Sequence, residues 1–141
     1  NQEDNRYGVS ENVSQRAMRE VYLRAFRIAI AEGKPWTVMS CYNRVNGTYV
    51  CNSRSLVTGV LRDEWGFDGL VMSDWSAVDK CSYAGAINAG NDLIMPGHES
   101  TVKKLAEQNK AGELNKAALE ISVMRVLELI FKSEVNKNCP V

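Results

Sequence analysis

Side chains that could do chemistry follow two apolar segments of the sequence. Tyr42 closes the run over residues 36–42, and Asp74 and Trp75 come directly after the run over residues 69–72. A carboxylate followed by an aromatic ring suits a saccharide, because the acid can face the anomeric carbon while the ring offers a stacking surface. Asp74 is therefore the first candidate for a catalytic residue.

Each candidate also has a purely structural interpretation. Asp74 could cap a helix that begins near Ser76, since aspartate is a favoured N-cap residue. Tyr42 could be a wall residue whose hydroxyl finds a neighbouring partner. Arg6 could be one more solvated surface cation. Periodicity alone leaves these alternatives open.

The elements that must position these residues alternate helical stripes with short apolar runs, which is typical of βα units on a parallel sheet. A helix is expected from the N-cap Ser14 to Gly33, with an apolar stripe of Met18, Val21, Tyr22, Ala25, Phe26 and Ala29. Strands are expected over residues 36–42, 69–72 and 93–95. Four more helices are expected. The first carries an apolar stripe and ends at Gly66, the second covers residues 76–89, and the two final helices contain Leu105 and Ile121. Functional groups of such folds gather at the carboxyl ends of the strands.

Three parallel strands are too few to close a barrel, and as an open sheet they would expose two edges. The sequence therefore predicts an α/β fold that is either a truncated doubly wound sheet or part of a larger (β/α) barrel. A doubly wound nucleotide-binding domain is disfavoured, because no G-x-G-x-x-G follows a strand.

Composition excludes several classes of partner. The chain has 141 residues, 45% of them hydrophobic, as expected for one ordinary domain. Its 17 basic residues are balanced by 17 acidic ones, so the excess of positive charge that binding to a phosphate backbone needs is missing, and no nucleic-acid partner is expected. No apolar run approaches the roughly 20 residues that cross a bilayer, so no membrane partner is expected either.

The four cysteines, Cys41, Cys51, Cys81 and Cys139, form no C-x-x-C pair, and neither zinc nor a dithiol redox site is indicated. We expect no metal, and reduced, mostly buried thiols. Asn46-Gly47 predicts a two-residue hairpin turn, whose register sets Cys51 opposite Tyr42 and disfavours a Cys41–Cys51 disulfide.

Several motifs occur together along the chain: Asn1-Gln2-Glu3 before Arg6, residues 38–43 with Asn46-Gly47, and residues 60–69, 71–75 and 89–97. In this order they resemble glycoside hydrolase family 3 of the β-glucosidase type. The resemblance covers essentially the whole chain and implies the later part of an N-terminal barrel domain. The implied fold is a partial (β/α)8 TIM-like barrel, with about three parallel strands and flanking helices over residues 1–135, and a linker or tail over residues 136–141.

The resemblance implies a role for five residues. Asp74 matches the catalytic nucleophile of a retaining glycosidase. Arg6 and Tyr42 match residues of the subsite for the nonreducing-end sugar, Trp75 matches an aromatic residue of the pocket wall, and Met39 falls close to the site. Nearby, Asp92 occupies a marked family position that we interpret as structural, and Asn91 stands where relatives carry an apolar residue.

The implied activity is that of a retaining exo-β-glycosidase acting on glucosides or xylosides without a cofactor. The implied acid/base residue and a Lys-His pair lie outside this chain, and Glu64, Glu99 and Glu113 match no family acid. The isolated chain is therefore expected to be inactive. Its expected partners are a β-glucoside or oligosaccharide substrate, the rest of the barrel, and an α/β sandwich domain that supplies the acid/base.

Two other interpretations are weighed. A truncated barrel could act without catalysis, as a carbohydrate-binding or scaffold piece, since its strand edges invite pairing. A branch of the family cleaves N-acetylglucosaminides with a His-Asp pair, but Trp75 favours the glucosidase-like branch. His98 does not match that pair and is expected to be a surface or capping residue.

Overall fold

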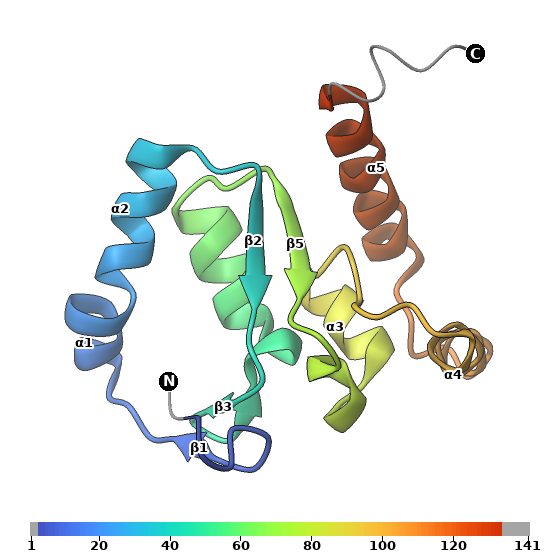
Figure 1. Ribbon diagram of the computed structural model, residues 1–141, viewed down its shortest axis with the longest axis horizontal. Coiled ribbons are helices and arrows are strands. Elements are labelled where there is room, and N and C mark those ends of the chain that lie inside the picture. Colours follow the sequence, from blue (N-terminus) through green and yellow to red (C-terminus); the bar gives the residue numbers. More distant parts are fainter. Residues whose placement is uncertain (1–2, 134–141) are drawn as a thin grey trace.

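Two parallel strands form the centre of the computed structural model, which describes residues 3–133 (Figure 1). β2 (Thr37–Ser40) and β5 (Leu70–Ser73) pair along their full length, with Ser40 opposite Ser73. Parallel neighbours require a crossover connection, and the segment between these strands supplies it with a hairpin and two helical elements. The two strands therefore end at the same level, and the residues that follow them share one rim.

The third predicted strand, over residues 93–95, is reduced to a single parallel bridge between Leu93 and Met72. The Ser73 amide donates a 2.8 Å hydrogen bond to the Leu93 carbonyl. Pro96 then follows without an N–H, so it cannot continue the ladder. The α/β class is confirmed, with two regular parallel strands and the rudiment of a third.

The helix predicted from Ser14 to Gly33 is present but interrupted. It is divided into α1 (Gln15–Ala17), the π-helical η1 (Met18–Tyr22) and α2 (Arg24–Gly33). Ser14 caps its start as predicted, accepting a 3.2 Å hydrogen bond from the Ala17 amide. The break comes where the Leu23 amide bonds to the carbonyl five residues back, that of Met18, which widens one turn.

The hairpin predicted at Asn46-Gly47 is confirmed. Both residues have positive φ angles, 49° and 87°, as a type I′ turn requires. The turn joins β3 (Arg44–Val45) to β4 (Thr48–Tyr49) in the predicted register, and β1 (Ser10–Glu11) pairs parallel to β3. The register makes Cys51 and Tyr42 opposite positions, although regular pairing ends before them.

The other helical elements are η2 (Val50–Asn52), η3 (Ser55–Glu64), η4 (Ala77–Lys80), α3 (Tyr83–Ala89), α4 (Glu99–Lys110) and α5 (Lys116–Lys132). The two final helices lie where periodicity predicts them. The expectation of one helix over residues 76–89 is wrong, because the backbone is extended at Cys81 and Ser82 starts α3 as a new N-cap. The Ser82 hydroxyl accepts a 2.9 Å hydrogen bond from the Gly85 amide.

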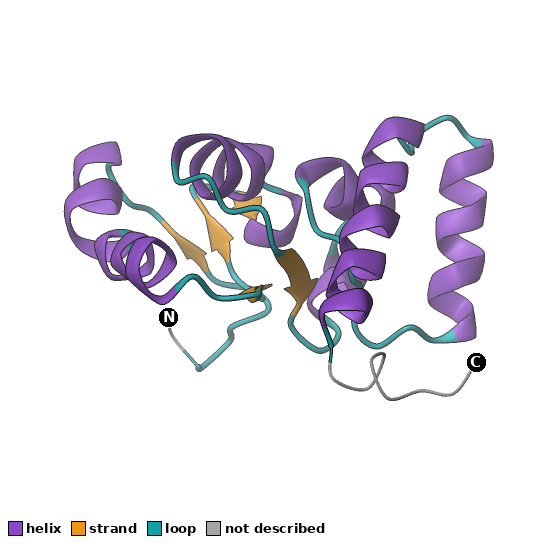
Figure 2. Ribbon diagram, turned by 90° about the horizontal axis from the view of Figure 1, so that it is seen from above, coloured by secondary structure: helices purple, strands orange, loops and turns teal. Residues whose placement is uncertain are grey.

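The strands lie between two groups of helices, α1 and α2 on one side and α3 to α5 on the other (Figure 2). One buried cluster packs Val57, Leu61 and Phe67 against Val71 of β5. The predicted apolar stripe of the first helix is largely uncovered: Phe26 is 62% exposed. Similar apolar side chains are exposed on α5, namely Ile121, Val123, Met124, Leu127, Ile130 and Phe131.

Two sequence expectations concern other parts of the chain. Within residues 3–133, no helix combines the length and apolar character that a membrane span requires. The linker or tail predicted over residues 136–141, with Cys139, lies outside the described residues.

Candidate active site

The register of β2 and β5 brings together the residues that follow them. The Asp74 amide donates a 2.9 Å hydrogen bond to the carbonyl of Ser40, the last residue of β2. The ladder thus continues one step past the strand ends and sets Tyr42 beside Trp75. Residues 33 positions apart in the sequence become neighbours at this rim.

The Asp74 side chain is half-buried, and it does not cap the following helix. Its Oδ1 accepts a 2.6 Å hydrogen bond from the Trp75 amide. Ser76, with a left-handed φ of 62°, is the N-cap of η4, and the Ala77 amide bonds to the backbone carbonyl of Asp74 instead of its carboxylate. The capping alternative therefore does not describe this structure, and the carboxylate stays at the rim.

Tyr42 is buried, and its hydroxyl donates a 2.5 Å hydrogen bond to the Trp75 carbonyl. Burial, the side chain of Tyr7 and the negative charge of Asp74 together raise the pKa of Tyr42 to about 12. The phenol therefore stays protonated at neutral pH. It acts as a hydrogen-bond donor within electrostatic range of the Asp74 carboxylate.

Arg6 lies against the aromatic side of this cluster. Its guanidinium carbon is 4.6 Å from the centroid of the Tyr42 ring, which is a cation–π contact. Arg6 also forms a 2.7 Å ion pair with Glu3, and the hydrogen bond to that carboxylate raises the pKa of Arg6. The site therefore keeps a permanent positive charge against the Tyr42 ring.

Tyr7 belongs to the same cluster and is not among the residues that sequence reasoning selects. Its ring meets the Tyr42 ring edge-on, with centroids 4.7 Å apart and planes at 64°. Its only sequence signal is that it follows Arg6, because its partners Tyr42 and Tyr49 are more than 30 positions away. The Tyr49 hydroxyl donates a 3.3 Å hydrogen bond to the Tyr7 carbonyl.

Trp75 and Met39 are the exposed members of the candidate set, at 59% and 58% exposure. Trp75 joins the cluster through its backbone, which contacts both Tyr42 and Asp74. Met39 pairs in register with Met72 and points away from Val38, which packs against the helices. The structure thus joins Arg6, Tyr42, Trp75 and Asp74 by contacts, whereas Met39 is placed near them by the ladder alone.

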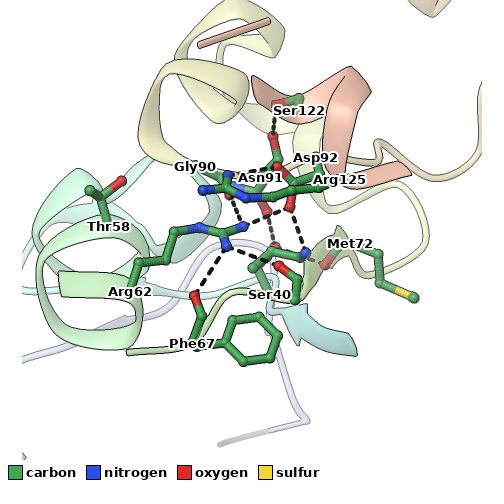
Figure 3. Close-up of polar contacts among 12 residues, drawn as sticks. Ser40, Thr58, Arg62, Phe67, Met72, Gly90, Asn91, Asp92, Ser122 and Arg125 are labelled. Atoms are coloured by element: carbon green, nitrogen blue, oxygen red, sulfur yellow. Dashed lines mark hydrogen bonds and ion pairs between the residues drawn. The ribbon is translucent and has the colours of Figure 1, made fainter. Parts of the chain in front are cut away.

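A buried ion-pair cluster supports β5 through the Val71 amide (Figure 3). The fully buried Asp92 carboxylate pairs with Arg62 at 2.6 Å and with Arg125 at 3.1 Å, and it accepts the Val71 amide at 2.8 Å. Desolvation by burial lowers the pKa of Arg62. These contacts agree with the structural interpretation of Asp92.

Gly90 lets the chain pass close to this cluster. Its φ of 107° is strained for other residues, and a Cβ there would lie 2.9 Å from the Thr58 hydroxyl. Its carbonyl accepts a 2.9 Å hydrogen bond from Arg62.

The buried Asn91, next to Gly90, links two other segments. Its side chain accepts a 2.7 Å hydrogen bond from the Ser40 hydroxyl and donates one of 2.6 Å to the Cys51 carbonyl.

Neither a metal-binding cluster nor a functional role for His98 is found among residues 3–133. Among residues 3–133, no three His, Cys, Asp or Glu side chains lie where they could hold a metal ion. His98 is exposed and begins α4 as its N-cap residue without a side-chain hydrogen bond to the helix. It therefore lies at the surface, as the sequence predicts.

Comparison with known proteins identifies the class of fold and the family. The model of the glycosyl hydrolase family 3 N terminal domain matches residues 2–129. The structure of β-glucosidase 3B from Thermotoga neapolitana, solved in complex with glucose, superposes with a TM-score of 0.86 at 40% identity over 95% of this chain. The fold is thus a portion of a (β/α)8 barrel of the TIM type, and the chain belongs to glycoside hydrolase family 3.

Two curated relatives show the range of the family. Thermostable β-glucosidase B of Acetivibrio thermocellus is 42% identical over 138 residues, 97% of this chain. A protein of Bifidobacterium longum named exo-α-(1→6)-L-arabinopyranosidase is 39% identical over 94% of this chain. The chain spans 18% and 17% of the lengths of these two relatives, and 20% of the Thermotoga chain.

Proposed function

We propose that the protein to which this chain belongs is a retaining, exo-acting β-glycosidase of the β-glucosidase or β-xylosidase type, with Asp74 as its nucleophile. The observation that carries the proposal is the position of the Asp74 carboxylate, at the carboxyl end of β5 beside the Tyr42 phenol. The carboxyl ends of strands are where (β/α) barrels place their reacting groups.

In the proposed reaction, the ionised Asp74 attacks the anomeric carbon of the nonreducing-end sugar while an acid protonates the leaving oxygen. The product of this step is a glycosyl ester on Asp74. Water then attacks the same carbon, activated by the former acid, and releases the sugar with its original configuration. The Trp75 amide, which donates to Asp74 Oδ1, fixes the plane of the carboxylate for this attack.

The neighbouring side chains take supporting roles in the proposal. The Arg6 guanidinium binds sugar hydroxyls, and its contact with the Tyr42 ring holds it at the site. Tyr42 remains a protonated phenol next to the carboxylate, where it can donate a hydrogen bond to it. The exposed Trp75 ring forms a wall of the sugar pocket. The exposed Met39 side chain lies on β2, close to the site.

The acid/base residue is proposed to come from an α/β sandwich domain elsewhere in the protein. A retaining pair of carboxyl groups is separated by about 5 to 5.5 Å. Glu64 ends η3, before the amino end of β5, and it forms an ion pair with Arg19, so it lies at the wrong end of the strand. Glu99 and Glu113 lie at the start of α4 and in the turn after it.

The exposed apolar side chains of the helices fit a partner within the same protein. Phe26 of α2 and Phe131 of α5 are 62% and 65% exposed. Burying such rings stabilises an interface by about 1.5–3 kcal/mol each. We propose that the rest of the barrel and the α/β sandwich domain cover these two faces.

Mechanism-based labelling tests the proposal. The full-length protein is treated with a 2-deoxy-2-fluoro-β-glucoside that carries a good leaving group, and the tryptic peptide of residues 63–80 is sequenced by mass spectrometry. We expect the fluorosugar on Asp74, no label in Asp74→Asn, and full labelling in Asp79→Asn. Asp79 is a matched control, because it lies in the same peptide and bonds to the Tyr83 hydroxyl.

The possible outcomes separate the proposal from its alternatives. Label on another carboxylate overturns the assignment of Asp74. The absence of both label and turnover, in a protein that still binds glucose, supports the noncatalytic carbohydrate-binding interpretation. A panel of nitrophenyl β-glucoside, β-xyloside and α-L-arabinopyranoside then identifies the preferred sugar.

A further inference from the structure

Two thiols from separate segments of the chain lie side by side. The sulfur atoms of Cys51, in η2, and Cys81, directly after η4, are 3.2 Å apart, although the residues are 30 positions apart in the sequence. Cys51 is fully buried, within a cluster formed with Val78, Tyr83 and Ala86. Cys81 packs against this cluster and is partly exposed.

We propose that Cys51 and Cys81 are a redox-sensitive pair, which a low-molecular-weight disulfide oxidises to an intramolecular disulfide. A disulfide has an S–S distance of about 2.05 Å, so the two sulfurs need to approach by only about 1.1 Å from their 3.2 Å separation. Because both thiols already lie within one packed cluster, a small change in side-chain torsion angles closes this gap. The bond would tie the segment after Tyr42 to the segment after Trp75.

The exchange has two steps, and it needs a disulfide RSSR as the oxidant. Cys81, which solvent can reach, attacks one sulfur of RSSR as the S–S bond breaks, and the Cys81 proton goes to the first leaving RS⁻, which departs as RSH. Cys51 then attacks the Cys81 sulfur of the mixed disulfide, and the Cys51 proton goes to the second leaving RS⁻, which departs as RSH. Two cysteine thiols are oxidised, and RSSR is reduced to two RSH.

The two thiols differ in how readily they ionise. The hydrogen bond between them lowers the pKa of Cys51 and raises the pKa of Cys81, so Cys51 ionises more readily of the two. Cys41 is the competing partner for Cys51. The hairpin register sets Tyr42, and not Cys41, opposite Cys51.

Peptide mapping tests the pairing in the full-length protein. Trypsin places the three described cysteines in separate peptides, residues 28–44, 45–54 and 81–103. The protein is reduced, then incubated with oxidised glutathione or left reduced, quenched in acid, alkylated while unfolded, and digested. We expect peptide 45–54 joined to peptide 81–103 after oxidation only.

Matched alanine variants make the result specific. Cys41→Ala should keep the cross-link, whereas Cys51→Ala and Cys81→Ala should lose it. Oxidation should raise the Tm of the wild type and of Cys41→Ala by at least about 2 °C, since the closed loop is long, and leave the other two variants unchanged. Complete alkylation of Cys51 and Cys81 after oxidation, or a link from Cys51 to Cys41 or Cys139, would overturn the proposal. The wild-type map decides this even if a variant fails to fold.

Discussion

The hydroxyl of Tyr42 donates a 2.5 Å hydrogen bond to the backbone carbonyl of Trp75, across the ends of two parallel strands. The same Trp75 residue donates its amide to the Asp74 carboxylate. One peptide segment thus links a buried phenol to the proposed nucleophile.

Removal of the Tyr42 hydroxyl should slow the proposed reaction. Tyr42→Phe leaves the Trp75 carbonyl without its partner, which costs about 1–3 kcal/mol. If this loss falls on the transition state, kcat/KM for an aryl glucoside drops by about five- to 150-fold in the full-length protein. Tyr49→Phe is the matched control, because its hydroxyl makes a longer 3.3 Å bond to Tyr7 and should change kcat/KM less than two-fold. Equal losses in both variants would argue against a special role for Tyr42.

The raised pKa of Tyr42 predicts a loss of stability at high pH. Its pKa is about 12 in the folded protein against an ordinary 10.0, so folding favours the protonated phenol. The stabilisation is complete below pH 10 and is lost as the pH rises towards 12. Urea unfolding of wild type and Tyr42→Phe, compared at pH 8 and pH 11, should show a stability difference that shrinks at the higher pH. A difference that stays constant would contradict the shift.

The Asp92 cluster should contribute strongly to stability and little to chemistry. Asp92→Asn leaves the buried Arg62 without its counter-charge, and we expect a loss of about 3–5 kcal/mol in the free energy of unfolding. Glu64→Gln breaks the exposed pair with Arg19 and should change that free energy little. Urea titration of both variants measures the contrast, and similar losses in the two would contradict it.

The buried Asn91 should stabilise the rim through its side-chain hydrogen bonds. Asn91→Leu, which replaces the amide by an apolar side chain, removes the partner of the Cys51 carbonyl and the 2.7 Å partner of the Ser40 hydroxyl, for a loss of about 2–3 kcal/mol. Ser40→Ala in the Asn91→Leu background should then cost less than Ser40→Ala alone, because its partner is already gone. Urea unfolding of the four proteins measures the coupling, and additive losses would argue that the two residues act independently.

The chain on its own should not hydrolyse glycosides, because the proposed acid/base lies elsewhere. We expect the isolated 141-residue chain to release no nitrophenol from aryl β-glucosides above the rate of its Asp74→Asn variant. The assay is read together with circular dichroism, to show that both chains have the same secondary structure. Turnover clearly above the control would show that a carboxylate within this chain serves as the acid.

Some of these features could be predicted because they depend on neighbouring residues. The Ser14 cap, the hairpin at Asn46-Gly47 and the apolar run that ends before Asp74 each follow from local side-chain chemistry and periodicity. The family motifs predict more than neighbouring residues do, because they identify the order of strands and loops in a barrel. The local pattern gave a wrong prediction over residues 76–89. The Ser82 hydroxyl caps a new helix inside the single helix that periodicity predicts there.

By itself, the sequence determined the α/β class, the family and the position of Asp74 directly after a buried strand. Only the tertiary structure decided which distant side chains meet: Arg6 on the Tyr42 ring, Arg62 and Arg125 on Asp92, and Cys51 beside Cys81. The physical reason is that caps, turns and periodicity act over a few residues, whereas these contacts depend on the register of β2 and β5 and on how the helices pack around them.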